Sequence, residues 1–147
     1  ANIEFRLGEI EYLPVADNTI DIIISNCVIN LSPEKDRVFK EAFRVLGPGG
    51  RIMVSDIVLE KELPEALKNN ISAYTSCISG AILKEDYINT IKGAGFIDIE
   101  ILDEADFPID YITGDDTAKI IKGAPEDSAA GKLQEIVLSI KVSAIKP

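Results

Sequence analysis

Apolar and polar positions follow one another along the chain in blocks that change from strand spacing to helix spacing. Residues 3–7 alternate apolar and charged side chains, which predicts a short strand. Residues 20–25 are almost all Ile, and such a run is typical of a strand buried on both faces of a parallel sheet. Residues 52–58 form a further apolar run and predict the next strand.

Helices are predicted between and after these strands. Ser32 and Pro33 are typical of a helix start. The apolar side chains that follow recur at helical spacing: Val38, Ala42, Phe43, Val45 and Leu46. Residues 47–50, Gly-Pro-Gly-Gly, end this helix and turn the chain into the strand at 52–58. Residues 63–70 predict a short helix, residues 72–81 a helix end and loop, and residues 84–94 a helix that Gly95 ends.

The C-terminal third changes the pattern. Residues 97–102 and 133–145 both alternate apolar and polar positions, and they predict two strands that pair antiparallel. Between them, residues 103–132 are acidic and contain scattered Gly and Pro. The whole pattern predicts an α/β, Rossmann-like three-layer sandwich with a mostly parallel sheet and an antiparallel terminal strand pair. We expect one domain over residues 1–147, with core strands and helices in 1–102, an acidic variable segment in 103–132 and a terminal strand in 133–147.

The carboxyl ends of the predicted strands are the expected ligand site, because open α/β sheets bind ligands there. These ends are residues 8–10, 25–27 and 55–56. The Gly-Pro-Gly-Gly run is not a phosphate loop, since such a loop follows a strand and opens a helix. Here the run follows a helix and opens a strand, so it is predicted to be a structural turn.

Composition excludes several function classes. The net charge is −10, with 25 acidic against 15 basic residues, and this surface would repel nucleic acid. No apolar run approaches the ~20 residues of a membrane span, and no signal peptide is recognisable, so we expect a cytoplasmic protein that binds no membrane. The chain contains no His, which excludes Ser-His-Asp and Cys-His catalysis and His-ligated zinc. No metal site is predicted.

The two cysteines could be either packing residues or ligands. In a chain without a signal peptide they are expected to be reduced thiols and not a disulfide. A reduced cysteine is often a small apolar filler. Yet Cys27 follows a predicted strand at its carboxyl end, and Cys77 lies among small residues outside any predicted strand. Thiolates select soft metals and metalloids, so both a filler role and a ligand role stay open.

Particular blocks of sequence resemble the arsenite S-adenosylmethionine methyltransferases of the class I methyltransferase family. They are I-S-N-C-V-I-N-L-S-P-E-K at residues 24–35, E-A-F-R-V-L-G-P-G-G-R at 41–51, Y-T-S-C-I-S-G-A at 74–81 and G-E-I-E-Y-L-P-V-A-D-N at 8–18. The resemblance runs from residue 1 to about residue 96. It implies transfer of a methyl group from S-adenosylmethionine to trivalent arsenic that is bound by thiolates. The substrate would be arsenite or thiol-conjugated arsenite.

The resemblance also implies site residues. Cys27 and Cys77 match the family's arsenic-binding pair, and we expect them to lie close together across the strand-end cleft. Glu9 matches the acid that accepts a hydrogen bond from the adenine amino group, and Ile10 the apolar residue beside it that packs on the ring. Asn26 lies where the family's fold meets the methionine end of the cofactor. Outside the resemblance, Glu9 would be a solvated loop carboxylate and Asn26 a residue that caps its turn.

The family's glycine-rich cofactor loop and ribose-binding acid have no counterpart in the sequence. The family's fold places the two strands that carry them between the strand at 3–7 and the strand at 20–25. We therefore expect an incomplete domain, a fragment that begins within it, binds S-adenosylmethionine weakly and is inactive alone. The unprotected strand at 20–25 would then be covered by the strand at 3–7 or by a second copy, and we expect a homodimer. Two alternatives remain: another small-molecule S-adenosylmethionine-dependent methyltransferase, or a non-enzymatic metalloid-binding module.

Overall fold

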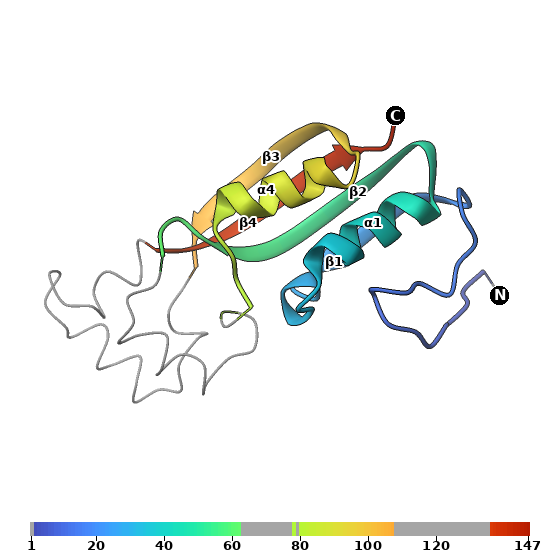
Figure 1. Cartoon of the computed structure of the whole chain (residues 1–147), viewed down its shortest axis with the longest axis horizontal. Coiled ribbons are helices and arrows are strands. Elements are labelled where there is room, and N and C mark those ends of the chain that lie inside the picture. Colours follow the sequence, from blue (N-terminus) through green and yellow to red (C-terminus); the bar gives the residue numbers. More distant parts are fainter. Residues whose placement is uncertain (1, 63–77, 79, 108–135) are drawn as a thin grey trace, which may run out of the picture.

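The computed structural model describes residues 2–62, 78, 80–107 and 136–147 (Figure 1). Its elements, in chain order, are β1 (Ile20–Asn26), the 3-10 turn η1 (Ile29–Leu31), α1 (Lys35–Val45), β2 (Leu46–Leu59), α4 (Lys84–Gly93), β3 (Ile97–Asp106) and β4 (Val137–Ile145). The predicted helix at 63–70, most of the predicted helix end and loop at 72–81 and most of the acidic segment lie outside the described residues. No helix in the described ranges is long and apolar enough to cross a membrane.

The strands form one mixed sheet in the order β1-β2-β4-β3. β1 and β2 pair in parallel, whereas β4 runs antiparallel to both of its neighbours, β2 and β3. The parallel pair and the antiparallel terminal pair were both predicted from the sequence and are confirmed. The described sheet is mixed and not mostly parallel, because β4 inserts between β2 and β3 and runs antiparallel to both. β3 continues to Asp106, four residues past the predicted end of the strand, because its acidic positions point into solvent while its backbone still pairs with β4.

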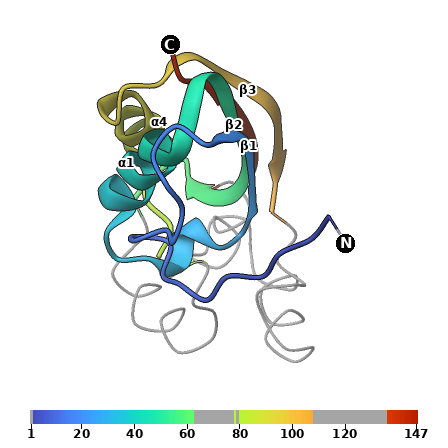
Figure 2. The same ribbon diagram turned by 90° about the vertical axis from the view of Figure 1, so that its right-hand side faces the viewer.

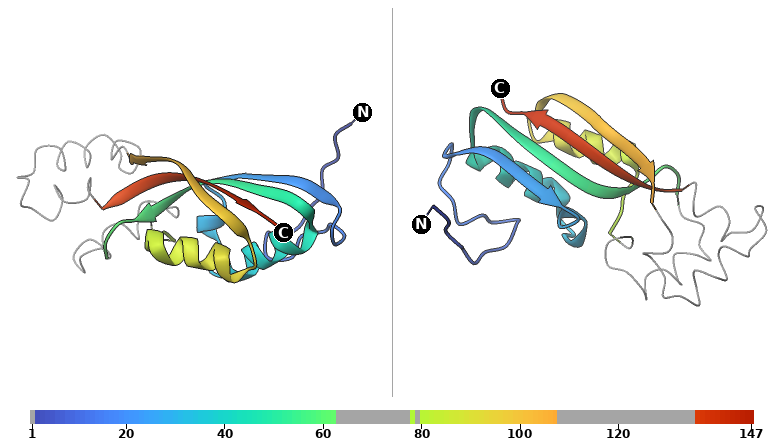
Figure 3. Two further views of the ribbon diagram at one scale, coloured as in Figure 1. Left: turned by 90° about the horizontal axis from the view of Figure 1, so that it is seen from above. Right: turned by 180° about the vertical axis from the view of Figure 1, so that it is seen from behind.

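The helices of the described residues, α1 and α4, cover the same face of the sheet, so this part of the chain shows two of the three predicted layers (Figures 2 and 3). α1 contributes Val38, Phe39 and Ala42 to the core between the layers, and α4 contributes Tyr87 and Ile91. The rings of Phe39 and Tyr87 meet edge to face at 5.5 Å between centroids. The predicted apolar stripe of α1 therefore does face the core.

The opposite face of the sheet is uncovered by any described helix (Figure 3). Ile22 and Ile24 of β1 are 54% and 78% exposed on this side, while Ile23 packs against the core. The prediction that β1 is buried on both faces is therefore wrong for the described part of the chain. The reason is that α1 and α4 supply only one helical layer.

The predicted strand at residues 3–7 is also wrong. These residues have no regular secondary structure, and Ile3, Phe5 and Leu7 are 73%, 95% and 101% exposed. A strand requires hydrogen bonds to a neighbouring strand, and the described residues offer none to this segment. Alternation of apolar and charged residues alone does not supply that partner.

Residues 47–50, which lead from α1 into the sheet, lie close to neighbouring backbone atoms. Gly49 has a φ of +79°, and a Cβ on Gly50 would lie 2.8 Å from the carbonyl oxygen of Gly47. Lys146 fastens the turn, since its backbone amide donates to Gly50 and its carbonyl oxygen accepts from the amide of Gly49. The run follows a helix and has a structural role, as predicted, but β2 begins at Leu46, so the predicted strand start at residue 52 is too late. Residues 47–50 form an irregularity within β2, where the register against β1 shifts between Ile20 and Ile22.

Candidate functional site

Cys27 stands at the point where the chain leaves the carboxyl end of β1. Its φ is +57°, a region that residues other than Gly seldom occupy. Its backbone amide donates to the carbonyl oxygen of Ser55 on β2 at 2.8 Å. The side chain is half-buried and packs against an apolar cluster that includes Ile57 and Ile136. The predicted position at a strand end is therefore correct, and the turn directs the thiol toward this cluster.

Cys77 lies outside the described residues, so the predicted proximity of the two cysteines stays a prediction. The residue that follows it, Ile78, is described and is 1% exposed. Ile78 belongs to the same apolar cluster against which Cys27 packs. The segment that carries Cys77 is thus connected to a residue buried beside Cys27.

A cavity of about 300 Å³ opens beside the end of β1. Two predicted cofactor-binding residues, Ile10 and Asn26, both line it, although they come from a loop and a strand. Most of the other walls are apolar: Leu13, Ile23, Ile24, Val28, Ile29, Val38, Ala42 and Ile52. The cavity could hold a flat ring between aliphatic side chains, with the amide of Asn26 at its polar edge.

Glu9 is not among the residues that line this cavity. It is exposed, and its backbone oxygen accepts from the amide of Tyr12 at 3.0 Å. Because residues 3–7 are not a strand, Glu9 begins a loop and does not follow a strand end. The structure therefore brings Ile10 and Asn26 together and leaves Glu9 outside the lining of the cavity.

The loop that carries Ile10 is fastened to α1. The Arg44 guanidinium donates to the carbonyl oxygens of Leu13 and Val15, at 3.1 and 2.9 Å. It also pairs with Glu41 at 2.8 Å and with Asp17 at 2.5 Å, and these two carboxylates raise the pKa of Arg44. Glu41 in turn accepts from the backbone amide of Leu13 at 2.9 Å, and the Arg44 hydrogen bond is the main cause that lowers the pKa of Glu41.

Two further contacts hold the same loop against the start of α1. The Arg37 guanidinium lies 3.7 Å from the centroid of the Tyr12 ring, a cation–π contact. The hydroxyl of Ser32 donates to the Glu11 carboxylate, and this bond is the largest cause that lowers the pKa of Glu11. Ser32 also accepts from the amide of Glu34 at 3.1 Å. The predicted helix start at Ser32 and Pro33 is wrong, since α1 begins at Lys35 with Glu34 as its N-cap and without a side-chain cap hydrogen bond. The Ser32 hydroxyl instead donates to Glu11, which holds the residues before the helix in a non-helical path.

Asp56 is a buried acid that was predicted at the carboxyl end of a strand. That prediction is wrong, since β2 continues to Leu59 in pairing with β4 and Asp56 lies inside the strand. It is 2% exposed, and its Oδ2 accepts from the Tyr87 hydroxyl at 3.0 Å. Burial raises the pKa of Asp56 to about 6, while hydrogen bonds from Tyr87 and from backbone amides act in the opposite direction. Burial is also the main cause that raises the pKa of Tyr87, and the charges of Asp56 and Cys27 add to it. The signal in the sequence was one acid inside the apolar run Met-Val-Ser-Asp-Ile-Val.

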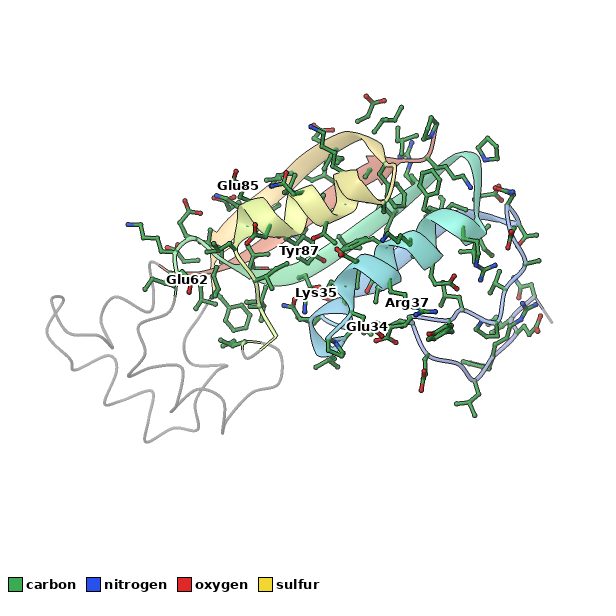
Figure 4. The ribbon with its side chains drawn as sticks, in the orientation of Figure 1. Glu34, Lys35, Arg37, Glu62, Glu85 and Tyr87 are labelled. Atoms are coloured by element: carbon green, nitrogen blue, oxygen red, sulfur yellow. The ribbon has the colours of Figure 1, made fainter. Side chains whose placement is uncertain are left out.

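Lys35 completes this polar group from the first residue of α1. Figure 4 labels Lys35 and Tyr87, which come from the two helices. The Lys35 ammonium donates to the carbonyl oxygens of Ser32 and Asn30, at 3.0 and 3.4 Å. Burial lowers its pKa, and the charge of Asp56 opposes this effect. No sequence signal marked Lys35, because a lysine in a first helical turn is ordinarily solvated.

The methyltransferase domain family matches residues 1–95 of the chain, which include both strand ends and the loop with Ile10. The chain belongs to the methyltransferase domain family. Within the family, an arsenite methyltransferase from Halobacterium salinarum is 47% identical over 100 residues. That match covers 68% of this chain and 26% of the relative.

Solved methyltransferase structures share the fold. An arsenic (III) S-adenosylmethionine methyltransferase from Chlamydomonas reinhardtii superposes with a TM-score of 0.72 at 33% identity, over 95% of this chain and 42% of that one. A phosphoethanolamine N-methyltransferase from Haemonchus contortus, solved with S-adenosyl-L-methionine, gives a TM-score of 0.64 at 19% identity, over 95% of this chain and 36% of that one. This methyltransferase domain chain thus spans about a quarter of the length of the Halobacterium relative and less than half of either solved chain.

Proposed function

We propose that this chain forms the arsenic-binding part of an S-adenosylmethionine-dependent arsenite methyltransferase. Cys27 and Cys77 hold trivalent arsenic, taken up as arsenite or as its thiol conjugate, through their sulfur atoms. The observation that supports this most is the placement of Cys27 at the strand end, beside the cluster that contains Ile78. The similarity to arsenite methyltransferases points to the same substrate.

The cofactor contacts that we propose in this chain are Ile10 and Asn26. Both line the cavity beside β1, whose aliphatic walls suit the adenine ring of S-adenosylmethionine. We also propose that Glu9 accepts a hydrogen bond from the amino group of the adenine ring, from a position outside the lining of this cavity. When bound, S-adenosylmethionine supplies an electrophilic methyl group on a sulfonium centre.

The main contribution of the protein to this methyl transfer would be to position the reacting atoms. Arsenic held by the Cys27 and Cys77 thiolates would present its own lone pair to a methyl group that bound S-adenosylmethionine would supply. No general base is needed for this step, which agrees with a chain that has no histidine. The contribution of Cys27 and Cys77 is to hold arsenic at near-attack distance. Both thiols must be ionised and reduced, so arsenic binding weakens at low pH and requires a reducing compartment such as the cytoplasm.

We further propose that residues 1–147 act as a single partial domain, with weak binding of S-adenosylmethionine and no turnover alone. The support is the absence of the family's glycine-rich cofactor loop from the sequence. Under this proposal the chain binds arsenite, because both thiols are present, but binds S-adenosylmethionine only weakly, because the glycine-rich loop is absent from the sequence.

Titration calorimetry with arsenite, on the 147-residue chain and its Cys27→Ser and Cys77→Ser variants, tests the proposal. We expect each single variant to bind roughly a hundredfold more weakly, because the second thiolate acts at high effective concentration once the first has bound. Each variant is checked for folding by circular dichroism. Equal binding by the parent chain and either variant contradicts the arsenic site. Tight binding of S-adenosylmethionine in the same instrument contradicts the partial-domain proposal.

A further inference from the structure

The turn that carries Cys27 is attached to β2 at successive residues. The amide of Cys27 donates to the carbonyl oxygen of Ser55 at 2.8 Å. Nδ2 of Asn30 donates to the carbonyl oxygen of Ile57 at 2.6 Å, and the Asn30 side chain is buried. Between these two ties lies Asp56, whose carboxylate also interacts with the backbone amide of Asn30. The turn therefore rests on a stretch of β2 whose centre is a buried acid.

Asp56 joins this stretch to α4. Its Oδ2 accepts from the Tyr87 hydroxyl at 3.0 Å, and its Oδ1 accepts from the amide of Ile57 at 3.2 Å. Tyr87 is 0% exposed and is held in turn by the Phe39 ring. Both oxygens of the carboxylate are thus engaged, one by the strand and one by the helix. A carboxylate bound on both sides has a single orientation.

α4 connects the same region to the segment that follows Cys77. The amide of Leu59 donates to the carbonyl oxygen of Ile82 at 2.9 Å, and the amide of Tyr87 donates to the carbonyl oxygen of Leu83 at 2.9 Å. The chain therefore returns to the end of β2 just before it enters α4. Tyr87 lies in the first turn of that helix, directly after the return.

We infer that Asp56 and Tyr87 are positioning residues, whose hydrogen bond fixes the Cys27 turn relative to α4 and so sets the placement of the Cys27 thiol. This inference rests on the proposed arsenic site. The affinity for arsenic depends on that placement, because arsenic must lie within bonding distance of both thiolates at once. The rate of a reagent that reacts with a single thiol does not depend on the distance between the two thiols. Comparing arsenite affinity with this rate therefore distinguishes a positioning role from a general loss of stability.

The test compares Tyr87→Phe with the parent chain. This variant deletes one hydroxyl and leaves the carboxylate of Asp56 without its helix partner. We expect the dissociation constant for arsenite, measured by calorimetry, to rise about tenfold. In a Cys77→Ser background, the rate at which Cys27 reacts with a monofunctional thiol reagent should stay within about twofold of that of the Cys77→Ser chain that retains Tyr87. A variant that merely loosened the fold would expose Cys27 and react faster.

Two further variants accompany the test. Asp56→Asn replaces one acceptor oxygen of the carboxylate with an N–H donor, so the hydrogen bond from the Tyr87 hydroxyl is not kept as it stands. This variant should therefore bind arsenite more weakly than the parent, as Tyr87→Phe does. Tyr12→Phe removes a hydroxyl from an exposed tyrosine and should have no effect. Should Tyr87→Phe not fold by circular dichroism, Asp56→Asn alters the same hydrogen bond from the side of β2 and takes its place in both assays.

The outcomes distinguish the two proposals. If the parent chain binds arsenite independently of Cys27, the arsenic site itself is wrong. If the parent chain needs both thiols but Tyr87→Phe binds with unchanged affinity, the positioning role is overturned. If Tyr87→Phe loses affinity for arsenite and its Cys27 also reacts faster with the monofunctional reagent, the positioning role is likewise overturned, because both results indicate general destabilisation.

Discussion

Cys27 and Ser55 are joined through the backbone at the end of the parallel strand pair, with the Cys27 amide 2.8 Å from the Ser55 carbonyl oxygen. This bond lies one residue beyond the last matched pair of β1 and β2, Asn26 with Ser55. Cys27 keeps it while adopting a φ of +57°. The cysteine is therefore held in a conformation that a residue chosen for packing alone would seldom occupy.

The first prediction concerns the stability of this turn. Cys27→Gly and Cys27→Ala both remove the thiol, but only Gly adopts a positive φ without strain. We expect Cys27→Gly to be more stable than Cys27→Ala by about 1 kcal/mol in urea unfolding. Cys27→Val, with a branched side chain, should be the least stable of the three. A Gly variant less stable than the Ala variant would show that the turn relaxes when the thiol is removed.

The second prediction concerns pH. The pKa of Asp56 is about 6 in the folded chain and near 3.8 when unfolded, so the folded state binds more protons between these values. Stability contributed by protonated Asp56 is therefore present at low pH and lost as pH rises through about 6. The loss is on the order of 2–3 kcal/mol. Urea unfolding at pH 4.5 and pH 7 measures it.

Asp56→Asn is the control for this pH effect, because an amide does not titrate. Other carboxylates act in the opposite direction. The pKa of Asp103 is lowered, mainly by its hydrogen bond from Lys141, so its contribution is lost as pH falls. The quantity to compare is thus the change from pH 4.5 to pH 7 in the parent chain minus that in the variant. A difference near zero, or one of the opposite sign, would contradict the assigned pKa.

The third prediction concerns the loop beside the cavity. Arg44→Met removes the contacts to the carbonyl oxygens of Leu13 and Val15 and the pairing with Asp17 and Glu41. Amide hydrogen exchange in residues 9–17 should then accelerate about tenfold, while exchange in β4 stays unchanged. Lys141→Met is the matched control, since Lys141 pairs with Asp103 at an exposed site on the β3–β4 pair. Unchanged exchange in the loop of Arg44→Met would show that packing, and not Arg44, holds Ile10 in the cavity.

The sequence predicted the order of the elements because helix and strand periods are local properties. The stripe of α1, its end before residues 47–50 and the antiparallel terminal pair all follow from spacing and from the conformational limits of Gly and Pro. Burial of β1 on its second face did not follow, since a run of Ile shows only that a strand is apolar. What covers each face depends on segments that contact it from elsewhere.

The candidate site was predictable only in part, for a related reason. Cys27 and Asn26 follow an obvious strand, so their location at its carboxyl end could be expected. The pairing of Asp56 with Tyr87 joins β2 to α4 across 31 positions of sequence, and no local pattern encodes it. Lys35 likewise becomes buried only because the turn before α1 folds its carbonyl oxygens around the ammonium group.

The last prediction concerns the two edges of the sheet, which differ in their protection. β3 carries acids at Asp98, Glu100, Asp103, Glu104 and Asp106, and charged edges resist pairing. The only charged residue of β1 is Asp21, and its apolar residues Ile22 and Ile24 are exposed. Residues 3–7 do not pair with β1 in the structure, so we propose that a second copy covers this edge. Light scattering at micromolar concentration should then report a dimer.

Ile24→Lys should make this dimer a monomer, because a lysine on an edge strand opposes pairing. The substitution reduces the negative net charge, so general repulsion between chains falls and cannot explain dissociation. Ile97→Lys makes the same change on β3, where Ile97 is 45% exposed, and should leave the dimer intact. A parent chain that scatters as a monomer contradicts the proposal, and so does an Ile24→Lys chain that stays dimeric. Equal dissociation by both lysine variants would place the contact on the open face of the sheet and not at the β1 edge.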